Sequence, residues 1–317
     1  MLSVNIPVFN IDAHPLVTAL VSQAGKIAAD IEIRIYDDGS GAAVREKNRS
    51  LAQLPGVVYR EMKANMGRAA LRNKMGADSF YGHLLFIDAD SKVISGSFLE
   101  TYLRHLPKNP VICGGTVYRQ ERPASPGKLL RWVYGSKREA LPARQRNSQK
   151  GFIITSNNFL IEKELLNRVG FREKLGPYGH EDTMLGYDLF CRGILPRHIE
   201  NPVEHTGLED SGTFLEKTRA ALENLFFISN ELIPDALDFR SQVRFLHQYH
   251  KITNAIPVAL LRLFHSAFHR MLEKNLTGEH PRLFLFDLYK VGYYSKVTRK
   301  GKNRQRGTTR PRGVSQA

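Results

Sequence analysis

A short apolar run, Leu84-Leu85-Phe86-Ile87, stops at two carboxylates in Asp88-Ala89-Asp90. Consecutive apolar residues before a polar turn are typical of a strand that is buried on both faces of a sheet. The i, i+2 spacing predicts that Asp88 and Asp90 share one face at the end of that strand. Two carboxylates held this close disfavour each other's ionisation, and a divalent cation with oxygen ligands removes the conflict. The pattern therefore predicts a metal site for a phosphorylated substrate, with a solvated turn as the alternative.

Strand patterns alternate with helix patterns along the first part of the chain. Apolar or β-branched runs at residues 4–9, 31–36, 57–59 and 84–87 are separated by segments that favour turns and helices. This alternation predicts an α/β fold with a mostly parallel sheet that is covered by helices on both faces. Ligands of such sheets bind beyond the carboxyl ends of the strands, and acidic residues directly follow two of these runs.

The order of several short motifs resembles the family 2 glycosyltransferases with the GT-A fold. The motifs are Ile6-Pro7-Val8-Phe9-Asn10, Asp37-Asp38-Gly39-Ser40, Asn65-Met66-Gly67 with Arg72-Asn73, Asp88-Ala89-Asp90 and Gly179-His180-Glu181-Asp182. The resemblance covers roughly residues 1–210, and its strength lies in order and spacing because each motif is short. It implies a Rossmann-like mixed sheet flanked by helices, the GT-A nucleotide-diphospho-sugar transferase fold, with a C-terminal helical extension.

The resemblance implies an inverting, metal-dependent hexosyltransferase. The implied donor is a nucleotide sugar, expected to be a UDP-sugar, and the acceptor is a saccharide or a lipid-linked saccharide of the kind used in polysaccharide biosynthesis. Mn²⁺ or Mg²⁺ is the implied cofactor because both ions accept oxygen ligands. A basic nucleic-acid-binding protein is the alternative that the net charge of +15 suggests, but no recognition motif supports it. A catalytically inactive GT-A-like binding module is a further alternative, which the acidic motifs argue against.

Four residues are implied to bind the nucleotide sugar. Pro7 belongs to the expected loop after the first strand, whose backbone would line the base pocket. Asp38 would accept a hydrogen bond from the base, and its alternative is a turn cap. Arg72 would lie near the base or the phosphates, and its alternative is a solvated helix face. Asp88 would contact the ribose.

Four further residues are implied to bind the metal or to carry the chemistry. Asp90 would bind the metal, and His205 would be a further ligand, although a lone histidine is more often structural. Asp182 would be the general base that deprotonates the acceptor hydroxyl. Glu181 would contact the acceptor or position the loop. The alternative for this acidic pair is plain stabilisation of the first turn of a helix.

The chain divides into three segments by composition. We expect a catalytic domain over residues 1–212, a helical region over 213–295 and a basic disordered tail over 296–317. Within the first segment, residues 119–150 are rich in Arg, Lys, Pro, Ser and Gln, which predicts a mobile loop near the active site.

The C-terminal part suggests contact with a membrane. Residues 256–272 mix apolar and basic side chains, as in a core helix or in an amphipathic helix on a membrane. No acidic residue follows Asp287, whereas lysines and arginines recur to the end. Such a tail is attracted to anionic lipid, and its alternative is a solvated tail without a ligand.

Cysteine usage and hydropathy indicate where the protein works. Both cysteines, Cys113 and Cys191, lie in apolar stretches and are expected to be buried thiols, neither paired nor bound to zinc. The first strand begins almost at Met1, which leaves no signal segment, and no apolar stretch is long enough to span a bilayer. A cytoplasmic protein is therefore expected, with peripheral binding to the inner face of the membrane as an option.

Overall fold

The computed structural model describes residues 1–106, 108–149, 151–175 and 178–308. The chain forms two compact units. The first consists of residues 1–122, 132–175 and 180–208, and the second of residues 123–131, 176–179 and 209–317.

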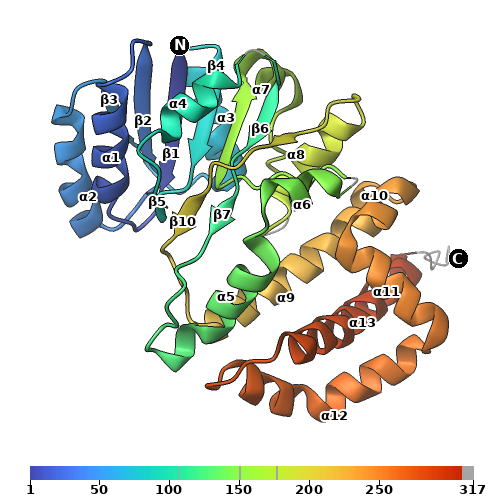
Figure 1. Cartoon of the computed structure of the whole chain (residues 1–317). Helices are drawn as coiled ribbons and strands as arrows, with labels where there is room; N and C mark the ends of the chain where they lie inside the picture. The colour runs from blue at the N-terminus through green and yellow to red at the C-terminus, as the bar shows by residue number, and fades with distance from the viewer. Residues whose placement is uncertain (107, 150, 176–177, 309–317) are drawn as a thin grey trace, which may run out of the picture. The chain divides into compact units, whose positions relative to one another are not determined.

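The first unit is built on a seven-stranded mixed sheet (Figure 1). Its strands, in spatial order, are β3 (Val57–Glu61), β2 (Ile31–Asp37), β1 (Leu2–Val8), β4 (His83–Ile87), β8 (Asn158–Glu162), β6 (Val111–Cys113) and β9 (Arg197–His198). β1 runs parallel to β2 and β4, and β2 runs parallel to β3, whereas β8 is antiparallel to both of its neighbours. The predicted α/β fold with a mixed sheet is confirmed.

Helices cover both faces of this sheet (Figure 1). They are α1 (His14–Ala24), α2 (Ala42–Arg49), α3 (Arg68–Asp78), α4 (Phe98–Arg104), α7 (Lys163–Val169) and α8 (Glu181–Phe190). Strand β4 shows why two layers are needed: Leu85 and Ile87 join the hydrophobic cluster that includes residues of α1 and α4. Leu84 and Phe86 point the other way and join the cluster that includes residues of α3, α7 and α8. The apolar run before Asp88 is therefore a strand buried on both faces, as predicted.

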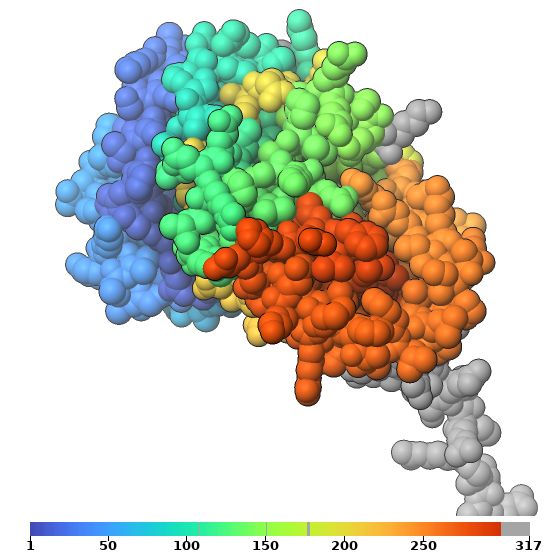
Figure 2. Space-filling view, turned by 60° about the horizontal axis from the view of Figure 1, so that its bottom comes forward, coloured from blue at the N-terminus to red at the C-terminus, as the bar shows by residue number. Residues whose placement is uncertain are grey.

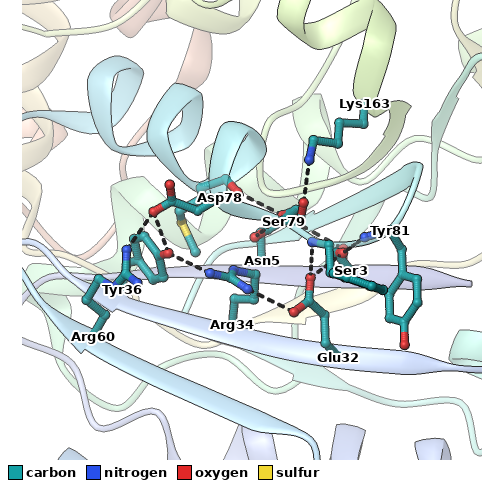
Figure 3. Close-up of polar contacts among 12 residues, drawn as sticks. Ser3, Asn5, Glu32, Arg34, Tyr36, Arg60, Asp78, Ser79, Tyr81 and Lys163 are labelled. Carbon is teal, nitrogen blue, oxygen red and sulfur yellow. Dashed lines mark hydrogen bonds and ion pairs between the residues drawn. The ribbon is translucent and has the colours of Figure 1, made fainter.

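A polar network lies on the sheet near the end of α3 (Figure 3). Arg34 donates hydrogen bonds to Glu32 and to the hydroxyl of Tyr36, both at 2.8 Å. The Tyr36 hydroxyl donates in turn to Asp78 at 2.7 Å, and Arg60 donates to the same carboxylate at 2.8 Å. The polar groups of the network satisfy one another's hydrogen bonds, which favours a structural role for the network.

A second, smaller sheet contains β5 (Ser91–Val93), β10 (Val203–His205) and β7 (Thr116–Val117), with β10 in the middle. β10 is antiparallel to β5 and parallel to β7. This sheet joins segments that are far apart in the sequence. Its strand β5 directly follows the Asp88-Ala89-Asp90 turn, whereas β7 and β10 come from later parts of the chain.

The expected mobile loop over residues 119–150 is not what the structure shows. Its described part contains η2 (Pro126–Lys128), α5 (Leu129–Tyr134), the π-helix η3 (Gly135–Glu139) and α6 (Ala143–Ser148). On α6, the buried Arg146 donates hydrogen bonds to the carbonyl oxygens of Leu141, Cys113, Gly114 and Ile199. These bonds satisfy backbone groups and fix α6 in the first unit, a role that the basic composition of the segment does not reveal.

The cysteine prediction is half correct. Cys113 on β6 is buried, whereas Cys191 is exposed. The difference arises because Cys191 follows the last residue of α8 as its C-cap, beyond the buried face of the helix.

The second unit is helical. It contains α9 (Ser211–Phe227), η4 (Ile228–Leu232), α10 (Leu237–Gln242), α11 (Arg244–Ala255), α12 (Val258–Leu276) and α13 (Leu283–Thr308). Helices α9 and α12 both pack on α13. No described helix is both long and apolar enough to cross a lipid bilayer.

The tail was expected to be disordered from residue 296, but the structure is still helical there. Helix α13 continues to Thr308, so residues 296–308 are helical. Phe286, Tyr289 and Tyr294 are buried and anchor the helix, and lysine and arginine are good helix formers that let it continue. Residues 309–317 of the predicted tail lie outside the described residues.

Candidate active site

The two carboxylates after β4 lie in a turn and have different surroundings. Strand β4 ends at Ile87, and the N–H of Ser91 donates to the carbonyl of Asp88, which closes the turn. Arg72 Nη2 on α3 donates to Asp88 Oδ1 at 2.6 Å. Asp90 instead faces His205, whose Nδ1 lies 3.5 Å from Asp90 Oδ2. Both carboxylates therefore lie in the turn after β4 and not within the strand. They still interact: burial and the neighbouring charge of Asp90 raise the pKa of the Asp88 carboxyl, against the opposing charge of Arg72.

The strand register places His205 beside Asp90. In the smaller sheet His205 is opposite Ser91, the residue that follows Asp90. The Thr206 N–H and hydroxyl both donate to the carbonyl of Asp90, at 2.8 and 2.7 Å. Burial alone would raise the pKa of the Asp90 carboxyl, but the hydrogen bond and the charge of His205 outweigh it and lower that pKa. Asp90 is therefore held ionised, as a metal ligand must be.

Asp90 and His205 fit a divalent ion that keeps open positions. Their side chains are 25% and 13% exposed, so both are accessible from solvent. No group of three or more His, Cys, Asp or Glu side chains that could hold an ion occurs among the described residues. An ion bound here would take its remaining ligands from water or from a bound molecule, as Mg²⁺ does when it bridges substrate phosphates.

Arg72 links the turn after β4 to the start of α8. Its side chain is 3% exposed, and its Nη1 lies 3.8 Å from Glu181 Oε1. Arg68, one turn earlier on α3, approaches the same Glu181 oxygen at 3.7 Å. Arg72 therefore joins Asp88 and Glu181, and its Nε and Nη1 atoms are buried without hydrogen-bond partners. Arg72 is therefore not part of a solvated helix face. In this structure its guanidinium contacts two carboxylates, those of Asp88 and Glu181.

Asp182 is the second residue of α8 and has an unusual proton affinity. The N–H of Thr183 donates to its Oδ1 at 2.7 Å. Burial, together with the charge of Glu181, raises the pKa of Asp182 to about 7. The residue before the pair, His180, is the N-cap of α8 and has a left-handed backbone with φ of 70°. A carboxylate with a pKa near neutrality is suited to accept a proton from a hydroxyl.

Asp38 has the contacts of a turn cap, the alternative given for it, whereas Pro7 lies outside the loop in which it was expected. Both carboxylate oxygens of Asp38 accept backbone hydrogen bonds, from Met66 N at 2.7 Å and from Gly67 N at 3.1 Å. The side chain is buried and fixes the loop before α3, although each oxygen keeps a lone pair for another donor. Pro7 lies inside β1 and not in the loop after it. It is tolerated because β1 pairs with β4 only over Ser3–Asn5, so Pro7 lies beyond the stretch that is flanked on both sides.

Residues 3–170, more than half of the chain, match the family model described as Glycosyl transferase family 2. The chain belongs to this family. A family 2 glycosyltransferase transfers a sugar from a nucleotide donor, so the acidic groups described above belong to an enzyme of that kind.

A solved structure agrees on the fold. The mannosyltransferase PcManGT from Pyrobaculum calidifontis, in complex with GDP-Man and Mn²⁺, superposes with a TM-score of 0.56 at 15% identity, covering 94% of this chain and 86% of that one. TarS 1-349 from S. aureus gives a TM-score of 0.44 at 14% identity and covers 95% of this chain and 91% of that chain. Its complex with UDP-GlcNAc gives 0.45 at 13% identity, with coverage of 95% and 92%. A search of curated proteins finds no sequence that matches.

Gly207 is a residue of this glycosyltransferase that sequence reasoning missed. A Cβ atom at this position would lie 2.3 Å from Asp90 Oδ2 and 2.8 Å from Asp90 Cβ. Only glycine therefore lets the Asp90 carboxylate keep its place beside His205. The signal in the sequence is a glycine two residues after His205, but its partner is more than a hundred residues away in the chain.

We expect Gly207→Ala to weaken metal-dependent nucleotide binding, because the new methyl group displaces Asp90. Changes to groups that orient a metal ligand cost about ten- to a hundredfold in metal affinity. The measurement is calorimetric titration of the enzyme with a nucleoside diphosphate over a series of Mn²⁺ concentrations. Gly96→Ala is the control, because a Cβ there meets open space. The same Mn²⁺ dependence in both variants would show that Gly207 does not position the Asp90 carboxylate.

Proposed function

We propose that this protein is an inverting hexosyltransferase that uses a divalent metal and a nucleotide sugar, expected to be a UDP-sugar. One observation supports this most strongly: the turn after β4 presents Asp90 beside His205, while Arg72 links Asp88 in the same turn to Glu181 at the start of α8. Candidate groups for the diphosphate and for the acceptor are thereby held in one unit. The Mn²⁺ and GDP-Man in the Pyrobaculum mannosyltransferase agree with this class of reaction.

On the donor side, each residue has a distinct role. Asp90 and His205 would hold Mn²⁺ or Mg²⁺, which when bound stabilises the negative charge of the departing nucleoside diphosphate. Asp88 would accept a hydrogen bond from the ribose, and Arg72 would keep its carboxylate oriented. Asp38 would bind the base through its free lone pairs while it fixes the loop before α3, and Pro7 would shape the strand end beneath that loop.

On the acceptor side, Asp182 would remove the proton from the attacking hydroxyl. Its raised pKa suits this task, because proton transfer is efficient when the pKa of the base is near the working pH. Glu181 would accept a hydrogen bond from the acceptor, with its charge balanced by Arg68 and Arg72. Attack from the side opposite the nucleoside diphosphate inverts the anomeric carbon.

The acceptor would be a saccharide, free or linked to a lipid, and the enzyme would work in the cytoplasm at the inner face of the membrane. The support for this part is charge: nine lysines and arginines and no acidic residue follow Asp287. Each cation near an anionic lipid surface contributes about 1 kcal/mol at modest ionic strength.

The test is a screen for release of nucleoside diphosphate from a panel of UDP- and GDP-sugars, with and without Mn²⁺ or Mg²⁺. We expect metal-dependent release from one donor class, no effect of added DNA, and an inverted product by NMR with a suitable acceptor. Absence of release from every donor would favour an inactive binding module. Tight DNA binding without release would favour the nucleic-acid alternative.

The pH dependence of turnover follows from Asp182. Its carboxyl group must be deprotonated to act as a base, and its pKa is raised to about 7. Activity should therefore be low in acid, rise as the pH passes through about 7, and level off above it. The measurement is kcat/KM for the donor as a function of pH at saturating acceptor, with circular dichroism to show that the fold persists. A flat profile across this region would contradict the assignment of Asp182 as the base.

A further inference from the structure

Helix α12 in the second unit carries an apolar stripe that faces solvent. Leu260, Leu263 and Met271 are 55%, 67% and 59% exposed, and Ala267 between them is also exposed. Their spacing of three, four and four residues places them on one face of the helix. We call these four residues the α12 stripe. Phe268 borders the stripe and is 43% exposed.

The fold of the second unit does not account for the stripe. Helix α12 packs on α13 through its opposite face, where His265, Leu272 and Leu276 are buried. At 100° per residue, the centres of the buried face and of the stripe lie on roughly opposite sides of the helix. In Figure 2 the orange segment that includes α12 forms part of the exposed surface. Contiguous exposed apolar side chains of this kind mark a surface that binds a partner.

Charge decides which partner fits. Arg270 and Lys274 are exposed at the edge of the stripe. The only acidic residue of α12, Glu273, is paired with Arg219 and accepts a hydrogen bond from Tyr289, so the stripe has no acidic neighbour on its own helix. Two copies of this basic face would repel each other. An anionic lipid membrane suits both groups, because its acyl chains can contact the leucines and its headgroup phosphates can contact the cations.

We propose that α12 lies on the surface of an anionic lipid membrane. The stripe enters the boundary between headgroups and acyl chains, while Arg270 and Lys274 extend to the lipid phosphates. This contact is separate from the attraction of the basic C-terminal segment, because it depends on apolar side chains of a helix that packs within the second unit. It is also independent of the identity of the transferred sugar.

The test is co-sedimentation of the full-length protein with vesicles of phosphatidylcholine alone or mixed with phosphatidylglycerol. The key variant is Leu260→Gln with Leu263→Gln, both at exposed positions. Leu237→Gln is the matched control, because Leu237 is 73% exposed but lies on α10, away from the stripe in the sequence. We expect wild type and control to bind the anionic vesicles and the double variant to bind at least about tenfold more weakly. Equal melting temperatures would show that folding is intact.

A second variant separates the stripe from the basic segment. Replacing Lys300, Lys302, Arg304 and Arg306 by Gln removes charge and leaves the stripe unchanged. We expect this variant to retain part of its binding and to lose less when salt is raised than wild type does. Equal binding of wild type and the double leucine variant would overturn the proposal. A wild-type dimer by light scattering that the leucine variant loses, without any vesicle binding, would assign the stripe to a second copy and also overturn it.

Discussion

We expect Asp182→Asn to lower kcat by roughly a hundredfold or more and to leave the affinity for the nucleotide sugar near that of wild type. The amide cannot accept the proton of the acceptor hydroxyl, and general-base catalysis contributes about 10²–10⁴-fold to such reactions. Donor binding persists because Asp182 contacts neither Asp90 nor His205 in the described hydrogen bonds and ion pairs; its described hydrogen bonds are to Thr183. The measurement is steady-state kinetics together with calorimetric donor binding in the presence of Mn²⁺.

Folding is not expected to confound this experiment. An acid whose folded pKa is raised opposes folding as the pH rises above its unfolded value, so the neutral amide removes that cost near pH 7. The melting temperature of Asp182→Asn should therefore not fall. Asp30→Asn is the control, because it makes the same change at an exposed position of the first unit. A loss of donor affinity with kcat unchanged at saturation would make Asp182 a binding residue and not the base.

Asp90→Asn should abolish transfer and remove the metal-dependent part of nucleotide binding. The neutral amide is a poor ligand for Mn²⁺ or Mg²⁺, and no third acidic or histidine side chain completes a metal cluster in the described part of the chain. Binding of a nucleoside diphosphate measured in chelator should remain near wild type, because that affinity comes from other residues.

His205→Gln provides the graded comparison for Asp90→Asn. It removes the neighbouring imidazole but retains the carboxylate, so we expect a higher Mn²⁺ requirement with activity restored at high Mn²⁺. Full activity of Asp90→Asn at saturating Mn²⁺ would refute the metal assignment. Equal loss of nucleotide binding with and without metal would show that Asp90 binds the nucleotide directly.

The sheet could be predicted because its evidence is local. In β4 the four apolar residues divide evenly between two hydrophobic clusters, and a run without polar residues is what such a strand requires. The end of the run also located the turn that holds Asp88 and Asp90. The partners of these two carboxylates were not predictable from that segment, since Arg72 comes from α3 and His205 from a separate three-stranded sheet.

The differences between expectation and structure have physical causes that spacing does not record. Asp38 was expected to accept a hydrogen bond from the base, with a turn cap as the alternative, and its carboxylate accepts hydrogen bonds from two backbone N–H groups of the loop before α3. Its contact with the base stays a prediction. Residues 119–150 were expected to be mobile because of their polar, basic composition, yet in the described part of this segment the Arg146 guanidinium donates hydrogen bonds to four backbone carbonyls. In each case a polar side chain that composition alone would place in solvent forms hydrogen bonds with the backbone, most of them in segments distant in the sequence. Such contacts form only when the helices and strands pack together, so the spacing of residues does not reveal them.

The most direct test of the proposed metal centre is anomalous diffraction from crystals of the protein grown with Mn²⁺ and a nucleoside diphosphate. We expect one strong manganese peak within coordination distance of Asp90 and His205, with the ribose near Asp88. The Asp90→Asn protein, crystallised in the same way, should lack that peak. A bound nucleotide without manganese beside Asp90, or a manganese peak at other residues, would contradict the claim that this turn is the metal centre of the enzyme.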